Sequence, residues 1–256
     1  KNILTEDQNG AINSIVVNLT WPCLVIDAMQ MKFSLQVLKD SAYILVVCLL
    51  ILAIIFAISF PVAKLIKLPK TKQYLTVFML LFGNTGFIGI PVIKALYGTD
   101  AVFYAAIVEL INILIFTVGI LLIQLSAGAN LKVGFKQFIN PGLIGVIIGL
   151  VLFLLNIHLP NLIGGSIEMI GNATTPLTMF CIGFQIGGLK FKEIAGDFQV
   201  YAICFVKLLI VPVLTLLVVK LWAGDFSMLE KVLIIGFAMP VGAVASIFSQ
   251  QYKGEA

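Results

Sequence analysis

The sequence predicts an all-α polytopic membrane protein, organised as inverted five-helix repeats with two crossing broken helices. Three observations support this fold class. First, the 256-residue chain is 61% hydrophobic and 11% charged, with a mean hydropathy of +1.12, which lies far outside the range of soluble globular domains. Second, the chain divides into apolar segments long enough to cross a bilayer. Third, two proline-containing motifs recur an odd number of segments apart.

Eight apolar segments alternate with short connections that carry lysine, proline or glycine. Since a spanning helix takes about 20 residues, each segment is a candidate span. Their approximate limits are 11–30, 41–63, 74–97, 102–125, 141–157, 162–188, 199–222 and 231–252. No soluble domain fits between them, because the longest connection, at 126–140, is a short loop that carries lysine.

The distribution of lysine predicts the orientation of the chain. All 16 basic residues are lysine, and the net charge is +4. Ten of the lysines lie outside the spans on the side of the N-terminus and four lie on the opposite side, while Lys94 and Lys207 fall inside spans. Because cytoplasmic loops are enriched in lysine and arginine, we expect both visible termini to be cytoplasmic.

Two pairs of matching motifs indicate an internal repeat. Asn18-Leu-Thr-Trp-Pro22 in the first segment matches Asn172-Ala-Thr-Thr-Pro176 in the sixth. Pro91 in the third segment matches Pro240 in the eighth, and an Ile-Gly pair precedes each of them. Both pairs are five segments apart. Because five is odd, the second copy must be inserted upside down relative to the first, as in many secondary transporters.

The repeat divides the chain into residues 1–125, a cytoplasmic connection at 126–140, and residues 141–256. Two five-helix repeats would give ten spans, whereas the segments here correspond to the middle eight. We therefore expect a first repeat without its first helix and a second repeat without its last. The chain also begins with Lys1 rather than Met, which favours a fragment over the alternative of a genuine eight-span protein.

The third segment contains the stretch from Gly83 to Tyr97, which should break the helix midway, around Asn84–Pro91. Three glycines weaken the helical propensity, and Pro91 lacks a backbone donor and clashes with the preceding turn. A broken helix is tolerated in a bilayer only where it is buried in protein or lines a cavity. We expect a second break at Met239–Ser246, which inversion would bring next to the first near mid-membrane.

The half-helices that follow such breaks expose backbone N–H groups and a positive dipole end, which suit a carboxylate or another anion. The two breaks therefore form a candidate substrate site. The alternative is that glycine and proline only permit close helix packing. The candidate substrate-binding residues are Asn84, Thr85, Gly86, Pro91, Pro240, Val241, Gly242 and Ser246.

The other repeated motif supplies a second symmetric set of polar residues. Each proline frees a carbonyl about one turn upstream, and the neighbouring threonine hydroxyls can take up that bond. A structural kink and a contact to an ion or substrate are both open for this set. Its members are Asn18, Thr20, Pro22, Asn172, Thr174, Thr175 and Pro176.

Ionisable groups inside spans are functional candidates because their burial in a bilayer is costly. Glu109, with Asn112 one turn further on, lies within the fourth segment, and Lys207 lies within the seventh. Three roles are open for these two charged residues. They can form a structural pair, with their hydrogen bonds made to each other or to backbone groups, or they can carry a proton, or they can neutralise the charge of the substrate. The coupling ion, H⁺ or Na⁺, is likewise open.

The composition argues against an enzyme and does not imply a nucleic acid partner. The four cysteines lie inside apolar segments without metal-ligand spacing, and His158 is the only histidine. We therefore expect no catalytic residues, no metal site and no cofactor.

Several stretches of the chain resemble the auxin efflux carrier family. They are Asn-Thr-Gly-Phe-Ile-Gly-Ile-Pro-Val-Ile-Lys-Ala-Leu-Tyr-Gly at 84–98, Thr-Pro-Leu at 175–177 with Phe-Cys-Ile-Gly at 180–183, Lys207 with Pro212, and Ala-Met-Pro-Val at 238–241 with Gln-Gln-Tyr at 250–252. The resemblance covers essentially the whole chain in the right order. That family includes plant auxin exporters and bacterial permeases often described as malate or malonate carriers, and the short connection at 126–140 looks like the bacterial form.

The resemblance implies a ten-helix inverted repeat, related at the level of fold to the sodium–bile acid symporters, with elevator-like alternating access. It places the family's crossover prolines on Pro91 and Pro240 and its polar crossover residue on Asn84. We therefore expect a bacterial permease of the cytoplasmic (inner) membrane that carries small organic anions, such as malate, malonate or auxin-like acids. A homodimer is one open assembly state. The alternatives are a sodium-coupled symporter of larger organic anions, a channel and a non-transporting receptor.

Overall fold

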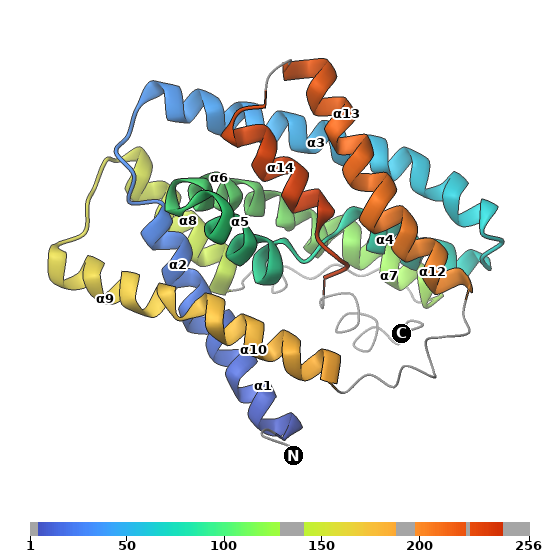
Figure 1. The fold of residues 1–256 in the computed structure, drawn as a ribbon, viewed down its shortest axis with the longest axis horizontal. Helices are drawn as coiled ribbons and strands as arrows, with labels where there is room; N and C mark the ends of the chain where they lie inside the picture. The colour runs from blue at the N-terminus through green and yellow to red at the C-terminus, as the bar shows by residue number, and fades with distance from the viewer. Residues whose placement is uncertain (1–4, 129–140, 188–197, 224–225, 243–256) are drawn as a thin grey trace.

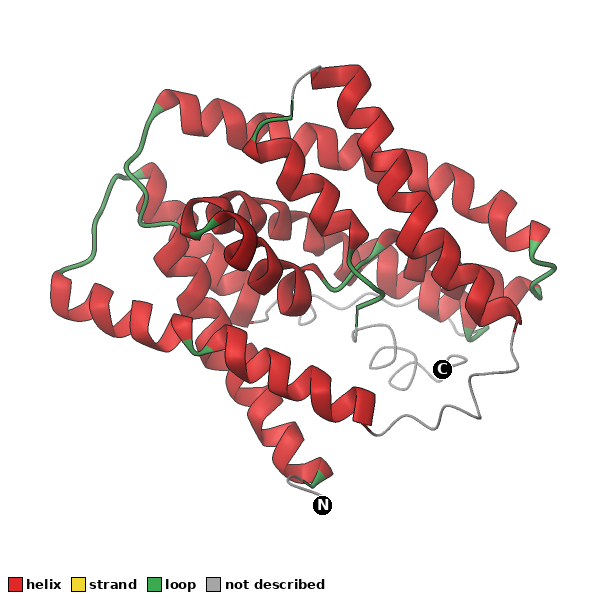
Figure 2. Cartoon of the chain, viewed as in Figure 1, coloured by secondary structure: helices red, strands yellow, loops and turns green. Residues whose placement is uncertain are grey.

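The computed structural model describes residues 5–128, 141–187, 198–223 and 226–242. All regular secondary structure in these ranges is helical, and no strand is found there (Figures 1 and 2). The described residues thus agree with the all-α class. The span count and the inverted repeat stay predictions, and nearly all of the predicted connection at 126–140 lies outside the described residues.

The helices α1 to α7 lie in the first half of the chain, and α8 to α14 lie in the second half. The first set is α1 Glu6–Ile15, α2 Trp21–Ala28, α3 Leu35–Leu65, α4 Lys70–Leu81, α5 Ile90–Tyr97, α6 Thr99–Glu109 and α7 Ile120–Ser126. The second set is α8 Pro141–Leu154, α9 Asn161–Asn172, α10 Thr174–Gly187, α12 Phe198–Phe205, α13 Val211–Ala223 and α14 Met228–Ala238. Further helical turns lie at Val16–Thr20, Thr85–Gly89, Ile115–Gly119 and Val206–Ile210, which are π-helical, and at Leu110–Leu114, which is 3₁₀.

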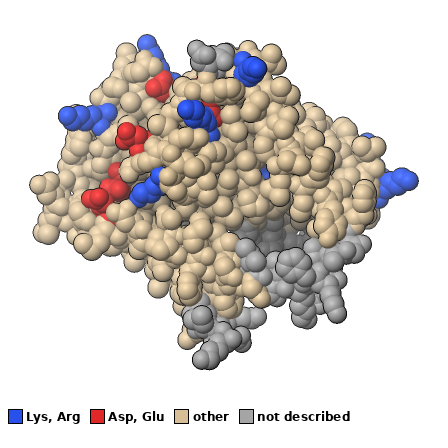
Figure 3. Space-filling view, viewed as in Figure 1, with Lys and Arg blue, Asp and Glu red and all other residues tan. Residues whose placement is uncertain are grey.

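Three helical stretches in the described part of the chain are long and apolar enough to cross a bilayer. They are Asp7–Ala28, Leu35–Leu65 and Phe198–Trp222. Large apolar side chains on the outer surface, such as Leu162 and Leu221, are 84% and 88% exposed, as expected for groups that contact lipid. On the face shown in Figure 3, charged residues gather mainly toward one side and leave broad uncharged areas.

The core draws most of its residues from α3, α4 and α6, with further buried side chains from α2, α5, α7, α8, α13 and α14. Every residue of α6 from Ala101 to Ile107 is buried, so this helix is surrounded by protein on all sides. Phe78 on α4 and Phe103 on α6 are among the largest fully buried side chains.

Three of the π-helical turns end just before a proline. The turn at Val16–Thr20 precedes Pro22, the turn at Thr85–Gly89 precedes Pro91, and the turn at Val206–Ile210 precedes Pro212. A proline ring inside an α-helix clashes with the carbonyl four residues earlier, and a widened turn moves that carbonyl aside. The chain therefore continues through these prolines as a helix.

Glycines allow α2 to approach α8 and α9 closely. On α8, Gly142, Gly145 and Gly149 all face α2. On α9, a Cβ added to Gly171 would lie 2.8 Å from backbone atoms of Leu24. Small residues at such contacts are typical of helices that pack together in membranes. In Figure 1 the α9–α10 pair accordingly lies across α1 and α2.

We expect Gly171→Ala to lower the apparent Tm of the purified protein by roughly 3–10 °C, since overpacking costs about 1–3 kcal/mol. The added methyl group must push α9 away from the backbone of α2. Gly165→Ala on the same helix is the matched control, because a Cβ there meets nothing within 4 Å. Equal Tm values for the two variants would contradict the close contact between α2 and α9.

Candidate functional site

The chain leaves the helical conformation in both segments for which a break is predicted. Helix α4 ends at Leu81, and α14 ends at Ala238. The next residues are extended, with φ −106° and ψ 106° at Phe82 and φ −66° and ψ 144° at Met239. In Figure 2 these stretches are drawn in green between red helices near the centre of the molecule. We call residues 82–84 and 239–242 together the crossing.

Backbone hydrogen bonds join the two extended stretches of the crossing. Gly83 and Val241 form an antiparallel β-bridge. The N–H of Asn84 donates to the carbonyl of Pro240 at 2.7 Å, and the N–H of Gly242 donates to the carbonyl of Phe82 at 3.5 Å. Since unpaired backbone groups are costly in hydrocarbon, two broken helices that cross can satisfy each other. The chains run in opposite directions where they meet.

The first break lies upstream of the position that the sequence predicts. The helix ends at Leu81 and resumes as the π-helical turn that begins at Thr85. Pro91 is buried inside α5, beyond the crossing, whereas Pro240 lies in the crossing itself. The two prolines therefore do not occupy equivalent places. The widened turn accommodates Pro91, and the chain opens instead where a partner backbone supplies hydrogen bonds.

Gly83 is required by the close approach of the two chains. A Cβ on this residue would lie 3.2 Å from the carbonyl oxygen of Met239. The carbonyl oxygen of Gly236 and Nζ of Lys207 would each be 3.5 Å away from it. A larger side chain at this position would have to separate the two broken helices.

Asn84 and Thr85 place polar side chains beside the crossing. Both residues are half-buried, and neither side chain makes a hydrogen bond to another residue in the described ranges. The first N–H groups of the helical stretch that follows Asn84 have no acceptor within that helix. Gly86 comes next, and a Cβ on it would lie 3.5 Å from the ring of Trp21. These groups can bind a small polar or anionic group.

A cavity of about 40 Å³ adjoins the crossing. Its lining comes from α3, α4, α14, the stretch from α6 into the following 3₁₀ turn, and residues Phe82, Gly83 and Thr85. The hydroxyl of Thr85 is the only one among the described lining residues. Such a volume can hold one or a few water molecules. Thr85 thus lies next to space that is open to a small polar group.

Glu109 lies near this cavity. Its side chain is 4% exposed, and Val108 and Ile111 on either side of it contribute to the lining. Asn112 belongs to the 3₁₀ turn Leu110–Leu114, and its side chain lies outside the described part of the structure. The structural and the proton-carrying role of Glu109 both stay predictions.

Lys207 reaches the crossing from a third helical stretch. It belongs to the π-helical turn between α12 and α13, and its side chain is 1% exposed. Its Nζ donates a hydrogen bond of 2.9 Å to the carbonyl of Leu80 in the last turn of α4. A hydrogen bond to a backbone carbonyl is what we expect if Lys207 has a structural role in which backbone groups satisfy its ammonium. The structure thus brings Lys207 together with the candidate substrate residues, while Ser246 lies outside the described residues.

The two Asn-x-Thr-x-Pro motifs lie where the α9–α10 pair passes over the α1–α2 pair. The hydroxyl oxygens of Thr20 and Thr174 are buried and have no hydrogen-bond partner among the described residues. In the described structure these two hydroxyls do not take up the carbonyls freed by the prolines, which was one of the possibilities that the sequence left open. Instead the side-chain amide of Asn18 donates to the carbonyl of Ser14 at 2.8 Å.

The remaining residues of these motifs surround the same contact. Pro22 lies in α2 and is half-buried, Asn172 is the last residue of α9, and Thr175 (half-buried) and Pro176 (exposed) lie in the first turn of α10. The interruption between α9 and α10 therefore precedes Pro176. Kink and ligand contact stay alternatives for this set.

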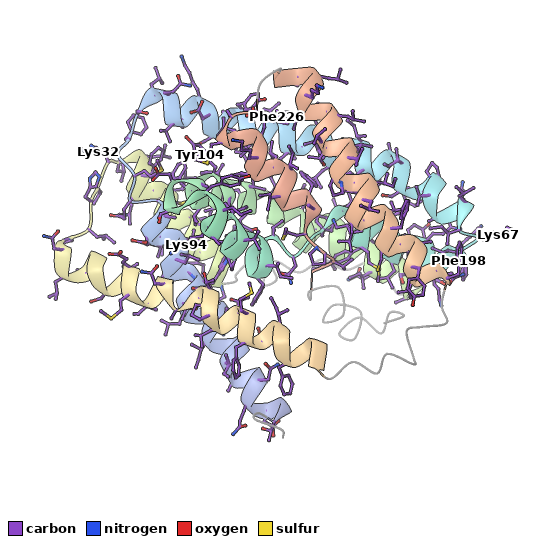
Figure 4. All side chains as sticks on the ribbon, in the orientation of Figure 1. Lys32, Lys67, Lys94, Tyr104, Phe198 and Phe226 are labelled. Carbon is purple, nitrogen blue, oxygen red and sulfur yellow. The ribbon has the colours of Figure 1, made fainter. Side chains whose placement is uncertain are left out.

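Two further residues that contact candidate site residues were not selected as candidates from the sequence. Lys94 on α5 donates from Nζ to Oδ1 of Asn172 at 2.6 Å and so links α5 to the end of α9 (Figure 4). The ring of Trp21 fills the space beside Gly86 and Gly142, and its Nε1 is buried without a partner in the described ranges. Trp21 lies inside a repeated motif, and this position is the signal that could have marked it as a candidate site residue.

Comparison with known proteins gives consistent matches. A family model described as membrane transport protein matches residues 1–255. Similar proteins include an uncharacterized transporter of Methanothermobacter thermautotrophicus, 24% identical over 197 residues that cover 76% of this chain and 64% of that protein. The uncharacterized transporter YfdV of Escherichia coli (strain K12) is 25% identical over 233 residues, covering 85% and 71%. The uncharacterized transporter MJ1031 of Methanocaldococcus jannaschii is 25% identical over 210 residues, covering 76% and 66%.

The chain thus spans 64% to 71% of the length of these relatives. The family match confirms the predicted resemblance to the auxin efflux carriers.

Proposed function

Since the chain belongs to the membrane transport protein family, we propose that it is a secondary carrier of small organic anions such as malate, malonate or auxin-like acids. The observation that supports this function most directly is the crossing of the two broken helices. Carriers of this kind bind substrates and ions at half-helix ends near the bilayer midplane. The antiparallel bridge between Gly83 and Val241 is compatible with two inverted repeats that meet at their breaks.

The chemistry beside the crossing favours an anionic substrate. The first N–H groups after Asn84, which have no acceptor within their own helix, carry partial positive charge, and the side chains of Asn84 and Thr85 add donors. A carboxylate accepts hydrogen bonds from groups of both kinds.

Alternating access would provide entry to this site. Movement of one repeat against the other would open the site to each side of the membrane in turn.

We place this carrier in the bacterial cytoplasmic membrane, with both visible termini in the cytoplasm because of the lysine distribution. Its partners in this proposal are the lipid bilayer and a small organic acid, and a homodimer is an open assembly state. No enzymatic reaction, cofactor or nucleic acid forms part of the proposal.

Uptake into proteoliposomes tests this function. We expect radiolabelled malate, malonate or indole-3-acetate to enter faster than into protein-free liposomes. The initial rate should saturate with substrate concentration, because each cycle of a carrier occupies one site. A flux that rises linearly with concentration would indicate a channel and contradict the proposal. Failure of all three acids to enter would contradict the proposed substrate class.

A further inference from the structure

The ammonium group of Lys207 lies beside the C-terminal ends of two half-helices. Its Nζ donates to the carbonyl of Leu80, which is in the last turn of α4. Nζ and the carbonyl oxygens of Gly236 and Met239, at the end of α14, also all lie within 3.5 Å of the position that a Cβ on Gly83 would occupy. The side chain therefore brings a cationic group to the place where both broken helices end.

Electrostatics favour a cation at this place. The last carbonyls of a helix have no partner within the helix and carry partial negative charge. Two such ends meet at the crossing, so their negative potentials add there. Lys207 is 1% exposed, and charge interactions are strong where water is excluded.

Carriers with broken helices use the same groups to bind a coupling cation, which is held by unwound backbone carbonyls and half-helix C-terminal ends. In this chain the carbonyl of Leu80 at the end of α4 accepts a hydrogen bond from the Lys207 ammonium, and the end of α14 lies close by. We propose that the Lys207 ammonium is a tethered cation that takes the place of a coupling Na⁺ at the crossing. The tether gives the ammonium a high effective concentration, so dissolved Na⁺ does not displace it.

This inference rests on the proposed carrier function, because coupling has a meaning only for a carrier. It narrows the choice of coupling ion: the Lys207 ammonium supplies the cation at the ends of α4 and α14, so uptake by the wild-type protein does not require Na⁺. Shortening the Lys207 side chain should leave a space lined by carbonyl oxygens. Such a space binds a monovalent cation.

Thermal unfolding of the purified protein tests the inference without a transported substrate. The apparent Tm is measured while NaCl replaces choline chloride at constant ionic strength. We expect the Tm of the wild-type protein to stay constant. In choline chloride, Lys207→Ala should have a Tm lower by on the order of 5 °C, because a charge-assisted hydrogen bond is lost. Added Na⁺ should raise this Tm again in a saturable manner.

Two further variants separate the charge from the shape of the side chain. In Lys207→Met an apolar chain of similar length fills the space, so the Tm should fall and Na⁺ should not restore it. Lys220→Ala removes an exposed lysine from α13 and should change neither the Tm nor its response to Na⁺. An unchanged Tm in Lys207→Ala, or a lowered Tm that does not respond to Na⁺, overturns the inference.

The wild-type protein decides the question even where Lys207→Ala does not fold. A saturable rise of its Tm with Na⁺, or an uptake that requires Na⁺, overturns the tethered cation and leaves the carrier function intact. If no organic acid is taken up, the proposed function fails, while the Tm series still measures whether Lys207 takes the place of Na⁺.

Discussion

Asn84→Ala is expected to lower the initial rate of organic-anion uptake by at least about tenfold, because a hydrogen bond to a charged group contributes about 1.5–3 kcal/mol. The Asn84 side chain lies beside the crossing and makes no hydrogen bond to another described residue, so its removal should affect binding more than folding. The measurement is the dependence of uptake on substrate concentration in proteoliposomes. The Tm of the variant should stay close to that of the wild-type protein.

The matched control for this prediction is Asn161→Ala. Asn161 is an exposed residue at the start of α9, far along the chain from the crossing. This variant should transport as the wild-type protein does. Equal uptake by the Asn84 and Asn161 variants would remove Asn84 from the substrate site.

Gly83→Val should abolish uptake and lower the apparent Tm by roughly 5–10 °C, since forced overpacking costs up to about 3 kcal/mol. A single Cβ at this position already lies 3.2 Å from the carbonyl oxygen of Met239, and two further methyl groups must push the broken helices apart. This separation would also break the hydrogen bond between Asn84 and Pro240. Uptake and Tm are measured on the same preparation.

Gly183→Val is the matched control for this second prediction. Gly183 is an exposed residue of α10, and a Cβ there meets nothing within 4 Å. The control should lose only the small amount of stability that a β-branched residue costs in a helix. A Gly83→Val protein as stable and active as this control would be incompatible with a tightly packed crossing.

The interruption of both helical segments could be predicted from the sequence, because glycine and proline weaken a helix wherever they lie; the continuation after residue 242 lies outside the described residues. The position of the first break could not. The sequence directs attention to Pro91, but a π-helical turn accommodates that proline, and the chain opens at Phe82–Asn84. The helical propensity of a segment shows where a helix is weak. Which residues leave the first helix is determined by hydrogen bonds to the backbone of the second segment at the crossing.

Long-range partners account for the other differences. Lys207 is visible in the sequence as a charge inside a span, but its acceptor, the carbonyl of Leu80, lies 127 residues away. The hydrogen bond between Lys94 and Asn172 spans 78 residues. Side-chain contacts over such distances follow from the tertiary packing, which spacing along the chain does not encode.

The central claim is that the substrate binds at the crossing, and protection of a cysteine at position 85 from alkylation tests it most directly. Thr85→Cys is introduced after Cys23, Cys48, Cys181 and Cys204 have been replaced by serine or alanine. N-ethylmaleimide is expected to reach this side chain, which lines the cavity beside the crossing, when movement of one repeat against the other opens the site. We predict that a saturating concentration of a transported acid slows this reaction and leaves the labelling of an exposed Ser227→Cys control unchanged. An unchanged rate at position 85, in a variant that still transports the acid, would contradict the claim.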